Sequence, residues 1–175
     1  MIEGLSLIIL LGLSAFFSGS ETALIALSRA RTDALAETGR PGARSLRQLK
    51  QNPSRMLVAI LIGNNLVNIS ASALATVLAT RAFGSIGPGI AVGGLTVVIL
   101  IFGEITPKSL ATRYSERISL AVAPIILALV HITVPVSRVF EYFTRNATSP
   151  GAGEDPTVTE SELISMAGYG EEEGT

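Results

Sequence analysis

The sequence contains no cysteine, a single histidine and few charged residues. The absence of cysteine excludes disulfides and thiolate metal sites. With one isolated histidine, sites for zinc, copper or iron are also disfavoured, because these ions use thiolate and imidazole ligands. The net charge is −1 and the arginines are not clustered with aromatic residues. Nothing in the chain therefore indicates nucleic-acid binding.

Charged residues make up 15% of the 175 residues, whereas soluble domains carry about 25%. Four runs have no charge when histidine is counted as neutral: residues 4–20, 56–80, 82–103 and 118–137. Their lengths are 17, 25, 22 and 20 residues, and a membrane-spanning helix needs about 20. The first run reaches this length when it is extended to residue 27. The composition indicates an all-α integral membrane protein.

A cleaved signal peptide is the alternative for the first run. Signal peptides begin with Lys or Arg, whereas Glu3 is the only charge before this run. The apolar pattern also continues past the length of a signal core. We therefore expect the first run to remain as a membrane helix.

The basic residues predict the orientation of the chain. Seven of the 13 Lys and Arg residues lie between residues 29 and 55. The positive-inside bias places this loop in the cytoplasm and the N-terminus outside. The third run then returns the chain to a second basic region, with Lys108, Arg113 and Arg117. These observations predict a multi-pass protein of the cell membrane with three spanning helices.

The fourth run, residues 118–137, has two interpretations. Pro124 and Pro135 each remove a helix hydrogen bond and bend the chain. We favour a bent juxtamembrane helix over residues 118–145, which wraps the other three helices and keeps the C-terminal tail inside. A fourth crossing, which would place the tail outside, is the alternative.

The basic loop at residues 29–52 contains the letters GRPG at 39–42, which predict two short helices joined by a turn. Leu46 and Leu49 give the second helix an apolar side. Three basic residues are available for lipid headgroups: Arg44, Arg47 and Lys50. A plain solvated hairpin is the alternative.

The composition changes after residue 146 to that of a linker. Thr159 and Glu162 then form a capping box that begins a short helix. We therefore divide the chain into a transmembrane domain at residues 1–146 and, at 147–175, a linker with the start of a cytoplasmic region. A cytoplasmic domain is expected to follow.

Polar clusters interrupt the first three apolar runs, with the letters SGSE at 18–21, GNNLVN at 63–68 and GEITPK at 103–108. An acid within a membrane costs at least ~2.5 kcal/mol on the insertion scale. Glu21 and Glu104 therefore need a counter-charge, a proton or a cation. An ion pair with Lys108, four residues after Glu104, is the non-functional alternative for Glu104.

The second run carries one polar stripe, because polar residues recur at every fourth position on a helix: Asn64, Asn68, Ser72, Thr76 and Thr80. Such side chains often only join helices by hydrogen bonds, which is the alternative here.

The third run has only about 13 residues between Ile90 and Glu104. This length is too short for an intact helix to cross before the acid. We expect the helix to break at residues 103–107 and to present its carbonyls to a cavity, as at the cation sites of transporters.

The clusters supply hydroxyl, amide, carboxylate and carbonyl oxygens, which are ligands for Mg²⁺, Ca²⁺ or alkali ions. Catalysis is not expected. A hydrolase would need His131 within reach of a serine and an oxyanion hole, and no Gly-x-Ser-x-Gly occurs. The glycines at 84–94 also lack the ending of a phosphate loop.

Three motifs together resemble the membrane domain of the CorC/cyclin-M (CNNM) magnesium transporters: FFSGSETA at 16–23, GNNLVN at 63–68 and FGEITPK at 102–108. The similarity runs from the N-terminus to about residue 145. The acidic stretch at 157–174 resembles the lead-in to the paired CBS domains of this family. The resemblance implies magnesium transport, with export as the expected direction and often linked to Na⁺, by a homodimer. It also implies three spanning helices with a juxtamembrane belt helix, and ATP binding only by the absent CBS domains.

Carried over by motif, the resemblance implies an Mg²⁺ site at Ser18, Gly19, Ser20, Glu21, Asn64, Asn68, Gly103 and Glu104. Glu21 matches only the bacterial branch of the family. Asn65, Pro107 and Lys108 are expected to support the site. A cation-sensing membrane anchor without transport is the alternative function. The expected break in the third helix favours transport, since a sensor needs no unwound helix.

Overall fold

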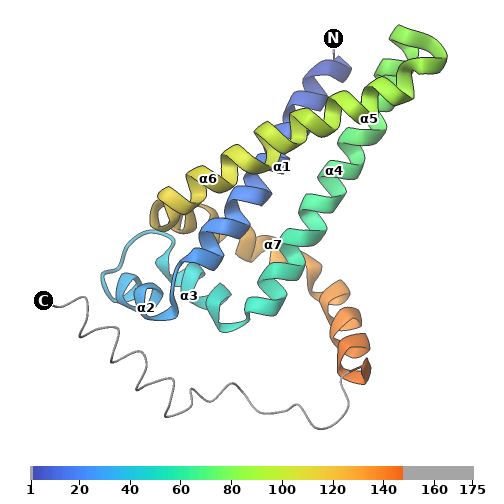
Figure 1. Cartoon of the computed structure of the whole chain (residues 1–175). Helices are drawn as coiled ribbons and strands as arrows, with labels where there is room; N and C mark the ends of the chain where they lie inside the picture. The colour runs from blue at the N-terminus through green and yellow to red at the C-terminus, as the bar shows by residue number, and fades with distance from the viewer. Residues whose placement is uncertain (1, 148–175) are drawn as a thin grey trace, which may run out of the picture. The chain divides into compact units, whose positions relative to one another are not determined.

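The computed structural model describes the backbone of residues 2–147 and the side chains of residues 3–134. Between residues 2 and 147 every regular element is helical (Figure 1). The elements are α1 (Ile2–Ala26), α2 (Arg29–Glu37), α3 (Ala43–Gln51), α4 (Pro53–Phe83), η1 (Gly84–Ile86), α5 (Gly87–Val98), η2 (Ile99–Ile105), α6 (Thr106–Arg113) and α7 (Ser115–Ala147). The predicted all-α class is confirmed.

Three stretches are long and apolar enough to cross a membrane: Glu3–Ala26, Pro53–Arg113 and Ser115–Val134. The second stretch is a helical hairpin, because the chain reverses at Gly84, where φ is +63°, and α5 packs back against α4. It therefore supplies two antiparallel legs, α4 and α5–α6. Together with α1 they are the three helices that the sequence predicts to span.

Large apolar side chains cover the outer surfaces of these three helices. Ile8 of α1, Ile69 of α4 and Val92 of α5 expose 68%, 68% and 64% of their surfaces. Contiguous exposed apolar surface of this kind is rare on soluble monomers. The exposed faces suit contact with lipid.

The third spanning helix, formed by α5, η2 and α6, differs from the prediction. We expected a break at residues 103–107, but the helix continues from Gly87 to Arg113 as 12 residues of α-helix, 7 of π-helix and 8 of α-helix. The N–H of Thr106 donates to the carbonyl of Ile101, five residues back, so the π-helix keeps hydrogen bonding next to Pro107, which has no N–H. The predicted interruption was therefore wrong in form. The irregularity at Ile99–Ile105 overlaps the predicted residues only at 103–105.

The basic loop forms the predicted pair of helices, α2 and α3. Gly42 in the turn between them has φ of +81°, and a Cβ atom there would lie 2.0 Å from the carbonyl oxygen of Leu120. Only glycine fits this close approach to α7. The apolar side of the α2–α3 hairpin, which includes Leu35, Leu46 and Leu49, is buried within the protein. It does not face lipid or solvent.

One apolar core joins the ends of α1 and α4 to the hairpin and to α7. It includes Leu24 of α1, Leu46 of α3, Ile60 of α4 and Ile126 of α7, all of which are at most 1% exposed. The carboxylate of Glu116, at the start of α7, also accepts hydrogen bonds from the guanidinium groups of two hairpin arginines, Arg31 and Arg40. The start of α7 is therefore fixed to the hairpin.

Helix α7 continues through Pro124 and Pro135 without interruption. Its position against the hairpin and the ends of two spanning helices is the one expected of a juxtamembrane helix, and its relation to the membrane stays a prediction. The capping box at Thr159 and Glu162 and the expected cytoplasmic region lie outside the described residues.

Candidate functional site

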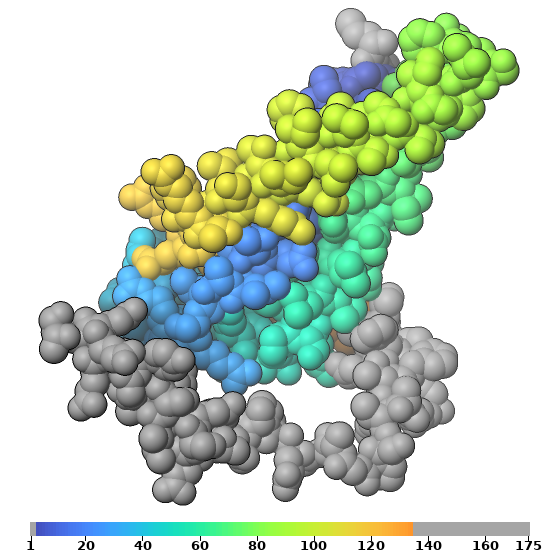
Figure 2. All heavy atoms as spheres, in the orientation of Figure 1, coloured from blue at the N-terminus to red at the C-terminus, as the bar shows by residue number. Residues whose placement is uncertain are grey.

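Helix α1 packs against α4 on one side and against η2 and α6 on another. On the face shown in Figure 2, the α5–α6 leg lies over α1. Glycines allow α1 to approach α4 and η2 closely. A Cβ atom at Gly63 of α4 would lie 2.5 Å from the ring of Phe17, and one at Gly103 of η2 would lie 2.9 Å from Ser14 Oγ. The polar segment of α1 is thus held close to both polar segments of the α4–α6 hairpin.

Buried oxygens without partners are found mainly on α1 and α4, with one more on α7. Six side-chain oxygens among residues 3–134 are buried and have no hydrogen-bond partner: Ser14 Oγ, Ser18 Oγ, Ser20 Oγ, Asn64 Oδ1, Asn68 Oδ1 and Ser119 Oγ. Most buried polar atoms in proteins are paired, and each unpaired one costs about 1–3 kcal/mol. Four of the six belong to residues that the sequence predicts as Mg²⁺ ligands.

The spacing on α1 brings some of these residues to one face and separates another. Ser14, Ser18 and Glu21 stand four and three residues apart, so they share a face of the helix. Ser20 is turned about 200° from Ser18, onto the side that carries Leu24 of the apolar core. The structure therefore does not group Ser20 with Ser18, although both are predicted ligands.

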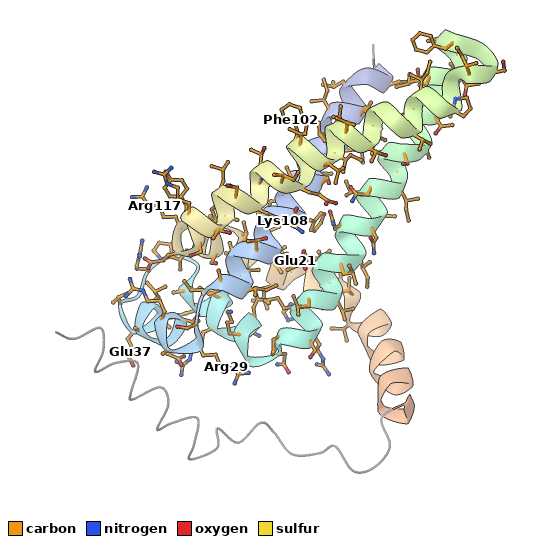
Figure 3. All side chains as sticks on the ribbon, viewed as in Figure 1. Glu21, Arg29, Glu37, Phe102, Lys108 and Arg117 are labelled. Atoms are coloured by element: carbon orange, nitrogen blue, oxygen red, sulfur yellow. The ribbon has the colours of Figure 1, made fainter. Side chains whose placement is uncertain are left out.

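Gly19 lies close to Pro107 of α6 in the structure. A Cβ atom at this position would lie 3.6 Å from both Cβ and the carbonyl oxygen of Pro107, which is ordinary van der Waals contact. Gly19 and Pro107 thus form part of the junction between α1 and α6. Figure 3 shows the labelled side chains of Glu21 and Lys108 where these two helices meet.

On α4 the two predicted asparagines lie beside the row of buried residues that includes Gly63 and Val67. Asn64 follows Gly63, which faces Phe17, and Asn68 lies one turn further along the helix. The oxygen of each amide is buried. Asn65 is exposed, so its predicted supporting role would not involve the buried face.

Two further hydroxyls of the polar stripe on α4 are satisfied within the helix. The hydroxyl of Thr76 donates to the carbonyl of Ser72 at 2.8 Å, and that of Thr80 donates to the carbonyl of Thr76 at 2.7 Å. These hydroxyls neither join helices nor remain without a partner. The buried oxygens of the stripe that lack a partner therefore belong to Asn64 and Asn68, whereas Ser72 is exposed.

The third segment brings Gly103 and Glu104 to the junction through the π-helix. Gly103 is buried against Ser14, and Glu104, the next residue, is half-buried. No ion pair joins Glu104 to Lys108 in the described part of the chain, and Lys108 is exposed. The alternative in which Lys108 neutralises Glu104 is therefore wrong for this structure.

Ser14 is the residue that the sequence prediction missed. Its side chain is 1% exposed, has no partner within residues 3–134 and touches the π-helix. Its spacing of four residues before Ser18 was a usable signal, because it places the two hydroxyls on one face. The hydroxyl alone, within a long apolar run, does not distinguish it from Ser6.

The donors are mainly neutral oxygens. Among the described residues no three His, Cys, Asp or Glu side chains come together in a way that could hold a metal. The carboxylates available at the junction are Glu21 and Glu104, beside hydroxyl and amide oxygens. Such a set suits a hard cation that keeps part of its water shell.

One known protein family matches almost the whole chain. The family described as the cyclin M transmembrane N-terminal domain matches residues 5–175. The chain belongs to this family. The resemblance inferred from the three motifs is confirmed.

Relatives occur in bacteria and plants. A UPF0053 protein of Haemophilus influenzae is 46% identical over 140 residues, which cover 80% of this chain and 33% of the relative. The UPF0053 inner membrane protein YfjD of Escherichia coli is 40% identical over 133 residues, covering 76% and 31%. A chloroplastic DUF21 domain-containing protein of Arabidopsis thaliana is 41% identical over 168 residues, covering 94% and 25%.

The chain thus spans a third or less of the length of these relatives. The apolar helices and the family assignment together make it a multi-pass membrane domain of the cyclin M type.

Proposed function

We propose that this domain transports Mg²⁺ across the cell membrane through a site at the junction of α1, α4 and η2. The observation that carries the proposal is the set of buried oxygens without partners at this junction, on Ser18, Asn64 and Asn68. A cation with its remaining waters would satisfy these oxygens, whose burial is otherwise unfavourable.

The chemistry of the donors favours Mg²⁺ over softer ions. Mg²⁺ binds six oxygens at about 2.0–2.1 Å and gives up its waters reluctantly. Glu104 supplies negative charge, while Ser18 and Asn64 supply neutral oxygens and shape. A site with so few carboxylates binds weakly enough to release its ion, which suits a transported substrate better than a resident cofactor.

The wider proposal includes the orientation and the assembly of the protein. The basic loop at residues 29–55 supports an outside N-terminus and an inside C-terminus. The small residues of the first and third apolar runs allow close helix packing, which supports a homodimer. Export as the direction, coupling to Na⁺ and regulation by ATP through CBS domains rest on the family resemblance alone.

Mg²⁺ flux through the full-length protein in proteoliposomes tests the proposal. Asn64→Ala, Ser18→Ala and Glu104→Gln should each reduce the initial Mg²⁺ flux and weaken Mg²⁺ binding in calorimetry. Loss of one charge-assisted contact at Glu104 corresponds to about a tenfold weaker affinity or more. Ser72→Ala is the matched control, because Ser72 lies on α4 with its side chain exposed.

Two outcomes would contradict the proposal. Unchanged Mg²⁺ affinity in folded Asn64→Ala and Ser18→Ala proteins would show that the site lies elsewhere. Normal binding without any flux in the unsubstituted protein would instead support the alternative of a cation-sensing membrane anchor.

A further inference from the structure

The α2–α3 hairpin contains a polar cavity, which lies apart from the proposed transport site. Its volume is about 210 Å³, and its walls are Arg29, Thr32, Asp33, Arg47, Lys50 and Gln51. The first turns of α2 and the last turns of α3 thus enclose it, beside the end of α1. The labelled side chain of Arg29 in Figure 3 marks this end of the protein.

The cavity has an excess of positive charge. Three of its side chains are cationic and one is an acid, Asp33. That acid is already paired, since Arg47 Nε lies 3.0 Å from Asp33 Oδ1. Within residues 3–134, neither Arg29 nor Lys50 has an acidic partner. Two cations therefore line the cavity without a neutralising charge.

Lys50 is held in place rather than free to turn away. Its Nζ donates a hydrogen bond of 2.6 Å to the carbonyl of Leu27, just past the last residue of α1. Partial burial lowers the pKa of Lys50, and the nearby charge of Arg29 lowers it further. The protein thus keeps two like charges close together at an energetic cost that a bound anion would remove.

We propose that this cavity binds a phosphate group, carried either by an anionic phospholipid or by a soluble phosphate. A phosphate offers several acceptor oxygens to the guanidinium of Arg29 and the ammonium of Lys50 at once. The amide of Gln51 can supply a neutral donor. The proposal does not depend on Mg²⁺ transport.

The position of the cavity favours the lipid as the source. Leu27 directly follows α1, which is one of the spanning helices, so the cavity lies at the level where phospholipid headgroups meet water. The basic loop is also expected on the cytoplasmic side, where anionic lipids attract basic residues. Of the residues predicted for headgroups, Arg47 and Lys50 line the cavity, whereas Arg44 does not.

The test uses the full-length protein and two defined phosphate probes. Retention of phosphatidylglycerol against phosphatidylcholine is measured by native mass spectrometry. Inorganic phosphate is added separately, and its effect on the thermal midpoint in neutral detergent is measured. Arg29→Gln should lower the retention of phosphatidylglycerol about fivefold, because one basic residue near a membrane contributes about that factor. Lys50→Gln should act in the same direction.

Arg44→Gln is the matched control, because it removes one exposed positive charge from α3 outside the cavity. Arg29 is itself exposed, so Arg29→Gln is expected to fold, and circular dichroism checks this. Selective loss of phosphatidylglycerol in the two cavity variants supports a lipid phosphate, and selective loss of stabilisation by inorganic phosphate supports a soluble one. The proposal is overturned if neither probe binds, or if Arg44→Gln weakens binding as much as Arg29→Gln does.

Discussion

At the scale of single residues, the hydroxyl and amide oxygens of the junction are unusual because the protein buries them without satisfying them. Ser14 and Ser18 are each 1% exposed, and both hydroxyls lack a partner within the described residues. In a structure that served only packing, alanine would fit either position without leaving a polar group unsatisfied. The two serines therefore carry an energetic cost, which the cation of the proposed site would offset.

Ser14→Ala separates these two effects. We expect it to leave the stability of the Mg²⁺-free protein unchanged or to raise it by about 1 kcal/mol, because an unsatisfied hydroxyl is removed. The same change should reduce the rise in thermal midpoint that Mg²⁺ produces. Thermal unfolding in detergent, with EDTA and then with a series of Mg²⁺ concentrations, measures both. Ser72→Ala should change neither, and a less stable Ser14→Ala protein with an unchanged response to Mg²⁺ would contradict this role.

Most candidate residues could be predicted from the sequence because an unfavourable group in an apolar run is visible without a structure. Glu21, Asn64 and Glu104 are of this kind. The direction of each side chain was harder to predict. Ser20 and Asn65 lie within the same motifs as the others, yet the rotation of the helix turns them elsewhere. Ser14 gave too weak a signal by itself.

At the scale of helices, the tight reversal between α4 and α5 depends on small residues. A Cβ atom at Gly87 would lie 2.4 Å from the carbonyl oxygen of Ala79 and 2.6 Å from the Cα of Thr80. Both are backbone atoms of α4, which cannot move aside as a flexible side chain can. A Cβ atom added at Gly94, on the same helix as Gly87, would meet open space, with no neighbouring atom within 4 Å.

Gly87→Ala should therefore destabilise the protein by about 1–3 kcal/mol through overpacking. Gly94→Ala is the matched control, and it should be neutral or slightly stabilising because alanine is the better helix former. Thermal midpoints of both variants in the same detergent provide the comparison. Equal midpoints would show that α4 and α5 do not approach as closely as the structure indicates.

The helices themselves could be predicted because apolar runs and glycine turns determine where they begin and end. Two features required the three-dimensional structure. The π-helix at Ile99–Ile105 depends on hydrogen bonds around Pro107, which composition does not reveal. The burial of Leu46 and Leu49 against α7 depends on a partner that is about 70 residues away in the chain, so the sequence left lipid and solvent open as alternatives.

At the scale of the whole molecule, the missing cysteines make the orientation directly testable. The 175 residues contain none, so a cysteine that is introduced here is the single labelling site of this domain. With the N-terminus outside and the tail inside, Glu3→Cys should react with a membrane-impermeant maleimide on intact cells. Ser161→Cys should react only after the membrane is opened. Reaction of Ser161→Cys on intact cells would mean that α7 crosses the membrane.

The π-helix at Ile99–Ile105 makes the third spanning helix sensitive to the number of residues in this segment. A π-helix takes up one more residue between bonded groups than an α-helix does, so it sets the rotation of α6 relative to α5. Removal of one residue from this segment would restore α-helical spacing and change the backbone around Glu104. Substitutions at exposed positions such as Leu100 leave that rotation unchanged. The segment therefore tolerates a change of residue type more readily than an insertion or a deletion.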